Sequence, residues 1–282
     1  MSDLWETSLE PTSTLADTVL DGISDLDGEE LDHYESHLRR AFDAHPPPFG
    51  EDWYGEKFTR LARDIRWVAG ALLANAVIEG EHAEKLWELA GATHNAIIAE
   101  LIRQHAVDAS RHSRMYVFLI KNLFPRAIPE QMRAQVNALS PGFTNNDHPT
   151  QTLPKATVRV LDELVQMNLG AIRTQKNQKL MAPVLRALCP HEIKVGVNVV
   201  LDRLLLDVTR HIEYTAKLIE EASRAGRAML LGDLVAQRTR EFNELTLDEI
   251  GEKPPAVSGC SDLSQARRRV TPVPIFRRTF SP

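Results

Sequence analysis

Two short stretches of the chain carry the residue types that could do chemistry. Asp108 and His112 stand four residues apart in the first, Asp207 and His211 stand four residues apart in the second, and an arginine directly precedes each histidine. Both stretches lie in runs typical of helix, where residues four apart share a face. Because carboxylate and imidazole groups suit transition metals, the repeated spacing indicates a metal site built from both stretches.

Each Asp/His stretch follows a predicted helix that carries a glutamate, Glu79 in the first half of the chain and Glu163 in the second. A carboxylate on an apolar helix face needs a partner. Folding each helix pair at its predicted turn puts Glu79 opposite roughly position 105 and Glu163 opposite roughly position 213, within about two turns of the Asp/His pairs. The predicted metal ligands are therefore Glu79, Asp108, His112, Glu163, Asp207 and His211.

Long helices must position these side chains. The chain is rich in helix-forming residues, with 14 glycines and 6% aromatic residues, which predicts an all-α fold. From about 53 to 90 apolar residues recur at three- and four-residue steps, which predicts a long amphipathic helix there. Pro183 is expected to kink or end the third long helix. Helices are predicted at 31–42, from about 53 to 90, at 95–122, near 130–139, from 154 to about 180, at 191–225 and at 229–246.

The two ends of the chain differ from its body. Residues 1–28 predict a loose arm, so residues 1–52 are interpreted as an acidic N-terminal arm with a short helix. Residues 53–250 form the predicted helical bundle domain, and residues 251–282 form a basic tail that we expect to be extended. The arginines at 267–269 and 277–278 could form a patch for nucleic acid or another anionic partner, or they could belong to a tail that is solvated or lies on the acidic N-terminal arm.

Composition excludes several classes of protein. The 282 residues are 43% apolar, which is enough for a globular core, and the two cysteines predict no disulfide framework. The N-terminus lacks the pattern of a signal peptide, and the longest apolar run, residues 68–78, is too short to cross a membrane. We expect a cytoplasmic protein that binds neither membranes nor nucleic acid, since no basic helix face with interleaved aromatic residues occurs.

The order glutamate, Asp/His pair, glutamate, Asp/His pair resembles that of ferritin-like di-iron carboxylate proteins. The stretch from Asp108 to Tyr116 is similar to the D-E-x-R-H-S-x-x-[FY] helix of the oxygenase branches of that superfamily, which include acyl-carrier-protein desaturases and relatives of p-aminobenzoate N-oxygenase. The similarity covers roughly residues 53–225. It implies a ferritin-like four-helix bundle with additional N- and C-terminal helices.

The chain departs from the family at one kind of position. The family's glutamate ligand stands three residues before the histidine, and this chain has Ala109 and Val208 there. Two interpretations follow. Either Asp108 and Asp207 bind metal themselves, or they pair with the neighbouring arginines and orient the histidines, in which case the site holds one iron ion or none. His105 is a further candidate ligand.

The resemblance implies a non-haem di-iron oxygenase or oxidase that holds two iron ions, uses O2, and acts on a small-molecule substrate by N-oxygenation, hydroxylation or desaturation. Such an enzyme needs an external electron donor, and a homodimer is possible. The alternatives are a mononuclear metalloenzyme and a metal-free or degenerate ferritin-like helical protein that serves as a binding module.

Overall fold

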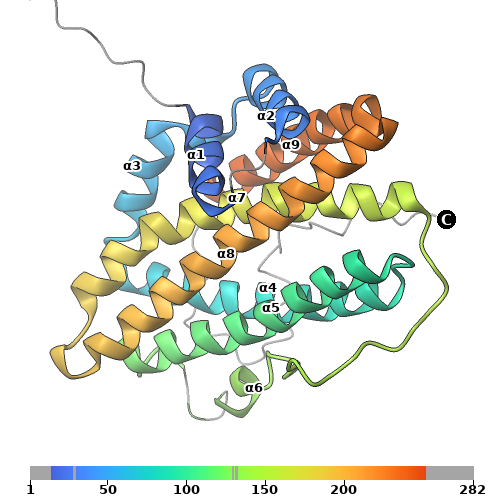
Figure 1. Ribbon diagram of the computed structural model, residues 1–282. Coiled ribbons are helices and arrows are strands. Elements are labelled where there is room, and N and C mark those ends of the chain that lie inside the picture. The colour runs from blue at the N-terminus through green and yellow to red at the C-terminus, as the bar shows by residue number, and fades with distance from the viewer. Residues whose placement is uncertain (1–13, 28–29, 129, 131–132, 252–282) are drawn as a thin grey trace, which may run out of the picture.

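The computed structural model describes residues 14–27, 30–128, 130 and 133–251, and these residues form helices and no strand (Figure 1). The all-α prediction is confirmed. The α-helices are α1 (Leu15–Asp27), α2 (Asp32–Ala44), α3 (Asp52–Leu61), α4 (Ile65–Gly91), α5 (Ala96–Leu123), α6 (Arg133–Asn137), α7 (Thr157–Leu188), α8 (Lys194–Ala222) and α9 (Ala228–Gly251). None of these helices is both long and apolar enough to cross a membrane.

Two pairs of long helices form the body. Helix α4 packs along α5, and α7 packs along α8, while α5 meets α8 where the two pairs come together (Figure 1). The starts of α4 and α5 are capped by side chains. Asp64 accepts a hydrogen bond from the Arg66 amide at the start of α4, and Asn95 accepts hydrogen bonds from the Ile97 and Ile98 amides at the start of α5, whereas among the described residues α7 and α8 have no side-chain cap. A carboxylate or amide oxygen at this position satisfies amides that have no partner within the helix.

Helices α1, α2 and α9 cover one side of the α7–α8 pair, while α3 contacts α7 and α6 contacts α5. Helix α9 packs on α7 and α2, and α1 packs on α2 and α8. Side chains from α1 and α2 share one apolar core with side chains from α4, α5, α7, α8 and α9. Apolar residues on both sides of position 52 therefore lie in the same core.

Three predicted elements need correction. Residues 15–27, expected as part of a loose arm, form α1, whose Ala16 and Val19 are buried. The helix expected from about 53 to 90 is two helices, because the chain turns at 62–64 before Asp64 caps α4. Helix α7 continues through Pro183 to Leu188. The predicted extended tail lies outside the described residues from position 252 on.

The long connection from α6 to α7 lies against α4 and α5. Phe143 stacks on Trp87 with ring centroids 4.1 Å apart, and the Arg103 guanidinium donates to the backbone carbonyls of Asn145 and Asp147. At Gly80 this connection comes so close that an added Cβ would lie 2.0 Å from the Leu139 carbonyl oxygen. The connection thus braces the helix pair that carries Glu79 and His112.

Candidate functional site

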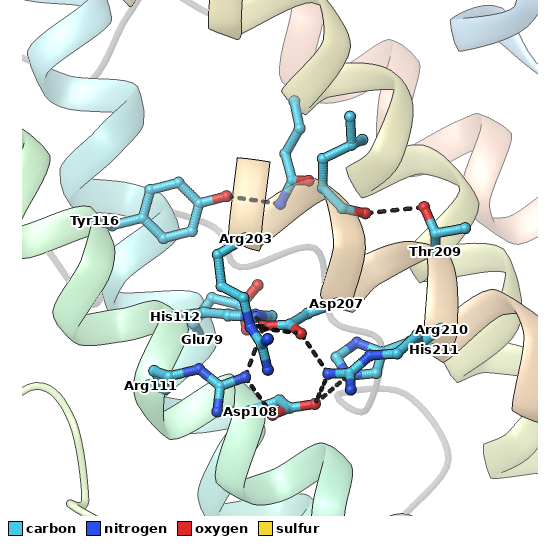
Figure 2. A network of polar contacts seen from close by, with 12 residues as sticks. Glu79, Asp108, Arg111, His112, Tyr116, Arg203, Asp207, Thr209, Arg210 and His211 are labelled. Carbon is cyan, nitrogen blue, oxygen red and sulfur yellow. Dashed lines mark hydrogen bonds and ion pairs between the residues drawn. The ribbon is translucent and has the colours of Figure 1, made fainter. Parts of the chain in front are cut away.

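The two Asp/His stretches meet between α5 and α8, and their partners cross over. His112 on α5 bonds Asp207 on α8, and His211 on α8 bonds Asp108 on α5, in each case from Nε2 at 3.1 Å (Figure 2). The exchange is possible because the two helices run antiparallel, so that a spacing of four residues on one matches the same spacing on the other. The result is an approximately two-fold arrangement at the junction of the two helix pairs.

Two arginines bridge the two carboxylates. Arg111 Nη2 donates hydrogen bonds to Asp108 Oδ1 and to Asp207 Oδ2, the latter at 2.6 Å. Arg210 Nη2 donates hydrogen bonds to Asp207 Oδ1 and to Asp108 Oδ2, the latter at 3.3 Å. Arg203 Nε adds a further bond of 3.0 Å to Asp207. Every oxygen of the two aspartates therefore accepts from a guanidinium, and their negative charge is compensated within the protein.

Glu79 on α4 completes the surroundings of His112. Its Oε2 lies 3.6 Å from His112 Nδ1, so His112 has a carboxylate at each ring nitrogen. Burial lowers the pKa of His112, but the bonds to Asp207 and Glu79 outweigh that effect and raise it to about 9. Burial also acts against ionisation of Asp207, yet His112 and Arg111 hold its pKa well below the usual range. His112 is thus an imidazolium at neutral pH.

The other three histidines of this region are neutral. The His105 ring stacks on His211 with centroids 3.6 Å apart and meets His82 edge-on at 5.4 Å. Burial, followed by the charge of neighbouring histidines, brings the pKa of His105 and of His211 well below normal, and burial lowers that of His82 to about 4. His105 Nδ1 also lies 2.9 Å from the Tyr214 hydroxyl. Neutral imidazole is the form that can coordinate a metal.

Five of the six predicted ligands come together, and Glu163 lies elsewhere. Two contacts between α7 and α8 fix the register of these helices: Asn168 bonds the Ile212 carbonyl, and Gln175 bonds Thr209. His211 lies between Thr209 and Ile212, so the α7 residue opposite His211 lies between positions 168 and 175. Glu163 is then about nine residues away, or roughly 13 Å along the helix. Its pKa is raised to about 7, first by burial, and its Oε2 has no hydrogen-bond partner among the described residues.

The predicted ligand set misses other residues around this network. Two α7 side chains lie beside the network: Gln175 donates a hydrogen bond to the Thr209 hydroxyl, and Gln178 donates one to the Tyr116 hydroxyl. Nothing in their spacing marks them in the sequence. Arg203 stands four residues before Asp207, so the helical i, i+4 rule could have found it. Ala109 and Val208, where the resembled family carries glutamates, are buried in the apolar core.

One pair of donors has the spacing of two ligands on a single metal ion. Two ligands bound about 2.1 Å from one metal lie about 3.0–3.6 Å apart, which includes the distance between Glu79 and His112 Nδ1. In metal sites a ligating histidine donates its other nitrogen to a carboxylate, as His112 and His211 do here to Asp207 and Asp108. As placed, however, no group of three or more His, Cys, Asp or Glu side chains in the described part of the chain could hold a metal ion. A metal would have to draw these side chains closer together.

Comparisons with protein-family models, with curated proteins and with solved structures found no match.

Proposed function

We propose that this chain is a mononuclear non-haem metalloenzyme whose metal ligands are Glu79, His112 and His211. One observation supports the proposal most: the Nε2 atoms of His112 and His211 bond Asp207 and Asp108. Nδ1 is therefore the ring nitrogen that each histidine could offer to a metal. Two histidines and one carboxylate form the ligand set typical of Fe(II) oxygenases. On this proposal, Asp108 and Asp207 orient the histidines and do not bind metal.

The chain's own residues have definite tasks in such a site. Arg111 and Arg210 hold both aspartates in place and neutralise their charge. The aspartates can then accept hydrogen bonds from the histidines without themselves binding the metal. His112 must release its Nδ1 proton before it can bind a cation. Ala109 and Val208, both buried, supply apolar contacts in place of the two missing carboxylates and help to exclude water.

When bound, Fe(II) supplies reactivity toward dioxygen, and the protein supplies placement and a dry surrounding. The proposed activity is oxidation of a small-molecule substrate with O2 and an external electron donor. A pair of iron ions is a weaker proposal, because the second ion has no free carboxylate: Asp108 and Asp207 are engaged by guanidiniums and Glu163 lies roughly 13 Å along α7.

Iron content tests the ligand assignment. Protein produced with added iron should carry iron, Glu79→Ala should lose it, and Glu163→Gln should keep it. Glu163 is the control because it is a second glutamate on a long helix of the bundle, buried where Glu79 is 15% exposed. Asp108→Asn should weaken iron binding by about 10- to 100-fold without abolishing it, as expected for a group that orients a ligand. Equal iron content in wild type and Glu79→Ala would contradict the proposal.

One observation favours a second candidate, a metal-free helical binding protein. The bridging guanidiniums already compensate the aspartates, so the network needs no cation for its charge balance. In that case the Asp/Arg/His network serves only to join the two helix pairs. Protein that lacks iron after production with iron, and whose thermal stability does not change when Fe(II) is added, would support this candidate.

A further inference from the structure

The three arginines of the network reach the protein surface. The side chains of Arg111, Arg203 and Arg210 are 28%, 40% and 45% exposed, although Asp207 beneath them is fully buried. Each arginine uses a single nitrogen to bond the aspartates. Since a guanidinium has five N–H donors, most donors of these side chains are left for other partners. Arg111 Nε is buried and has no hydrogen-bond partner among the described residues.

Charge and rigidity both favour an anion at this face. Three guanidiniums face two aspartates, so one positive charge remains after pairing. The aspartates fix the orientation of the guanidiniums before any ligand arrives. A pre-oriented site loses less conformational freedom on binding. Guanidiniums bind carboxylates through paired, parallel hydrogen bonds.

Apolar side chains flank the arginines on the same helix face. Val199, Arg203, Leu206 and Arg210 follow one another at steps of three or four residues along α8, and Val199 and Leu206 are 63% and 49% exposed. A ligand that places a charged group on the arginines would therefore lie against apolar surface with its remaining part. An organic anion suits this combination better than an inorganic ion does.

We infer that the surface formed by Arg111, Arg203, Arg210, Leu206 and Val199 binds a small organic carboxylate, with the carboxylate on the guanidiniums and the apolar part on Leu206 and Val199. This site is separate from the proposed metal ligands, and its occupation does not require a metal. If the metal site also exists, the carboxylate ligand would lie on the outer side of the aspartates that orient His112 and His211.

Calorimetric titration of the full chain with benzoate tests this inference. Benzoate should bind saturably, and Arg203→Gln should weaken binding by about tenfold or more, the effect of losing one charged hydrogen bond. Arg186→Gln is the matched control, because Arg186 is an exposed arginine on α7 that pairs with Asp202. Arg186→Gln should bind benzoate as the wild type does. Thermal unfolding confirms that both variants are folded, and Arg203→Lys, which keeps the charge, should bind with intermediate affinity.

Three results would overturn the inference. The first is the absence of saturable benzoate binding by the wild type. The second is equal weakening by Arg203→Gln and Arg186→Gln, which would indicate a general effect of surface charge. The third is acetate binding as tightly as benzoate, because the apolar surface at Leu206 and Val199 would then contribute nothing. Iron content is measured separately, so failure of this site and failure of the metal site can be distinguished.

Discussion

His112 and His211 hold equivalent places in the two halves of the network, but among the described residues only His112 has carboxylates at both ring nitrogens. Each bonds the aspartate of the opposite helix at 3.1 Å, while Glu79 adds a second acidic contact to His112 alone. Two residues in matching positions therefore differ in protonation: the pKa of His112 is raised to about 9, whereas burial and the charge of His112 depress that of His211. The network is symmetric in geometry and asymmetric in charge.

Asp207→Asn should be strongly destabilising. The asparagine cannot balance the positive charges of His112, Arg111 and Arg210, and loss of one partner of a buried ion pair costs about 3–5 kcal/mol. Urea unfolding measures the loss. Asp202→Asn is the control, because Asp202 is 68% exposed and its pair with Arg186 contributes about 1 kcal/mol or less. Similar losses in both variants would contradict the network described here.

Glu163 should make stability depend on pH. Its pKa is raised from 4.5 to about 7 by burial, so the folded protein binds this proton more tightly than the unfolded chain does. The contribution of this proton to the free energy of unfolding is fully present below about pH 4.5 and is lost as the pH rises through 7. The total change in the free energy of unfolding is roughly 3 kcal/mol.

Glu163→Gln is the variant that isolates this effect, since glutamine stays neutral at every pH. The free energy of unfolding of Glu163→Gln, measured relative to the wild type, should rise between pH 4.5 and pH 8. A constant difference over that range would show that Glu163 does not titrate as described.

Gly80→Ala should destabilise the protein because the connection after α6 leaves no room for a side chain. The added Cβ would lie 2.0 Å from the Leu139 carbonyl oxygen, and overpacking of this kind costs about 1–3 kcal/mol. The control is Gly22→Ala in α1, where no atom lies within 4 Å of an added Cβ. That variant should gain about 0.5–1 kcal/mol, as alanine does in a helix. Thermal unfolding of both variants checks the prediction, which fails if Gly80→Ala is neutral.

The sequence predicted the four long helices from its helix-forming composition, from the apolar spacing of residues 53–90, and from the prolines and caps at the predicted helix ends. It could not predict which histidine each aspartate contacts. A spacing of four residues allows a hydrogen bond between Asp and His of the same helix as well as the observed bonds between α5 and α8. The position of Glu163 depended on the turn between α7 and α8. We expected that turn at 184–190, but α7 runs to Leu188 and α8 begins at Lys194, which moves Glu163 past the level of His211.

The first helix, α1, shows a different limit of sequence interpretation. Its residues are rich in Asp, Ser and Thr and do not favour helix on their own, but Ala16, Val19 and Leu20 gain burial against the core. Tertiary packing outweighs weak helix propensity there. The break before α4 was missed because the apolar periodicity continues across it, while the Asp64 cap is a local feature.

On the proposed function, the network orients two histidines toward one metal ion. Anaerobic titration of the metal-free protein with Fe(II), followed by calorimetry, measures how many ions the chain binds. The wild type and Glu163→Gln should saturate at one Fe(II) per chain, and Glu79→Ala should show no saturable binding. Saturation at two Fe(II) per chain, or no binding by the wild type, would contradict the proposed function.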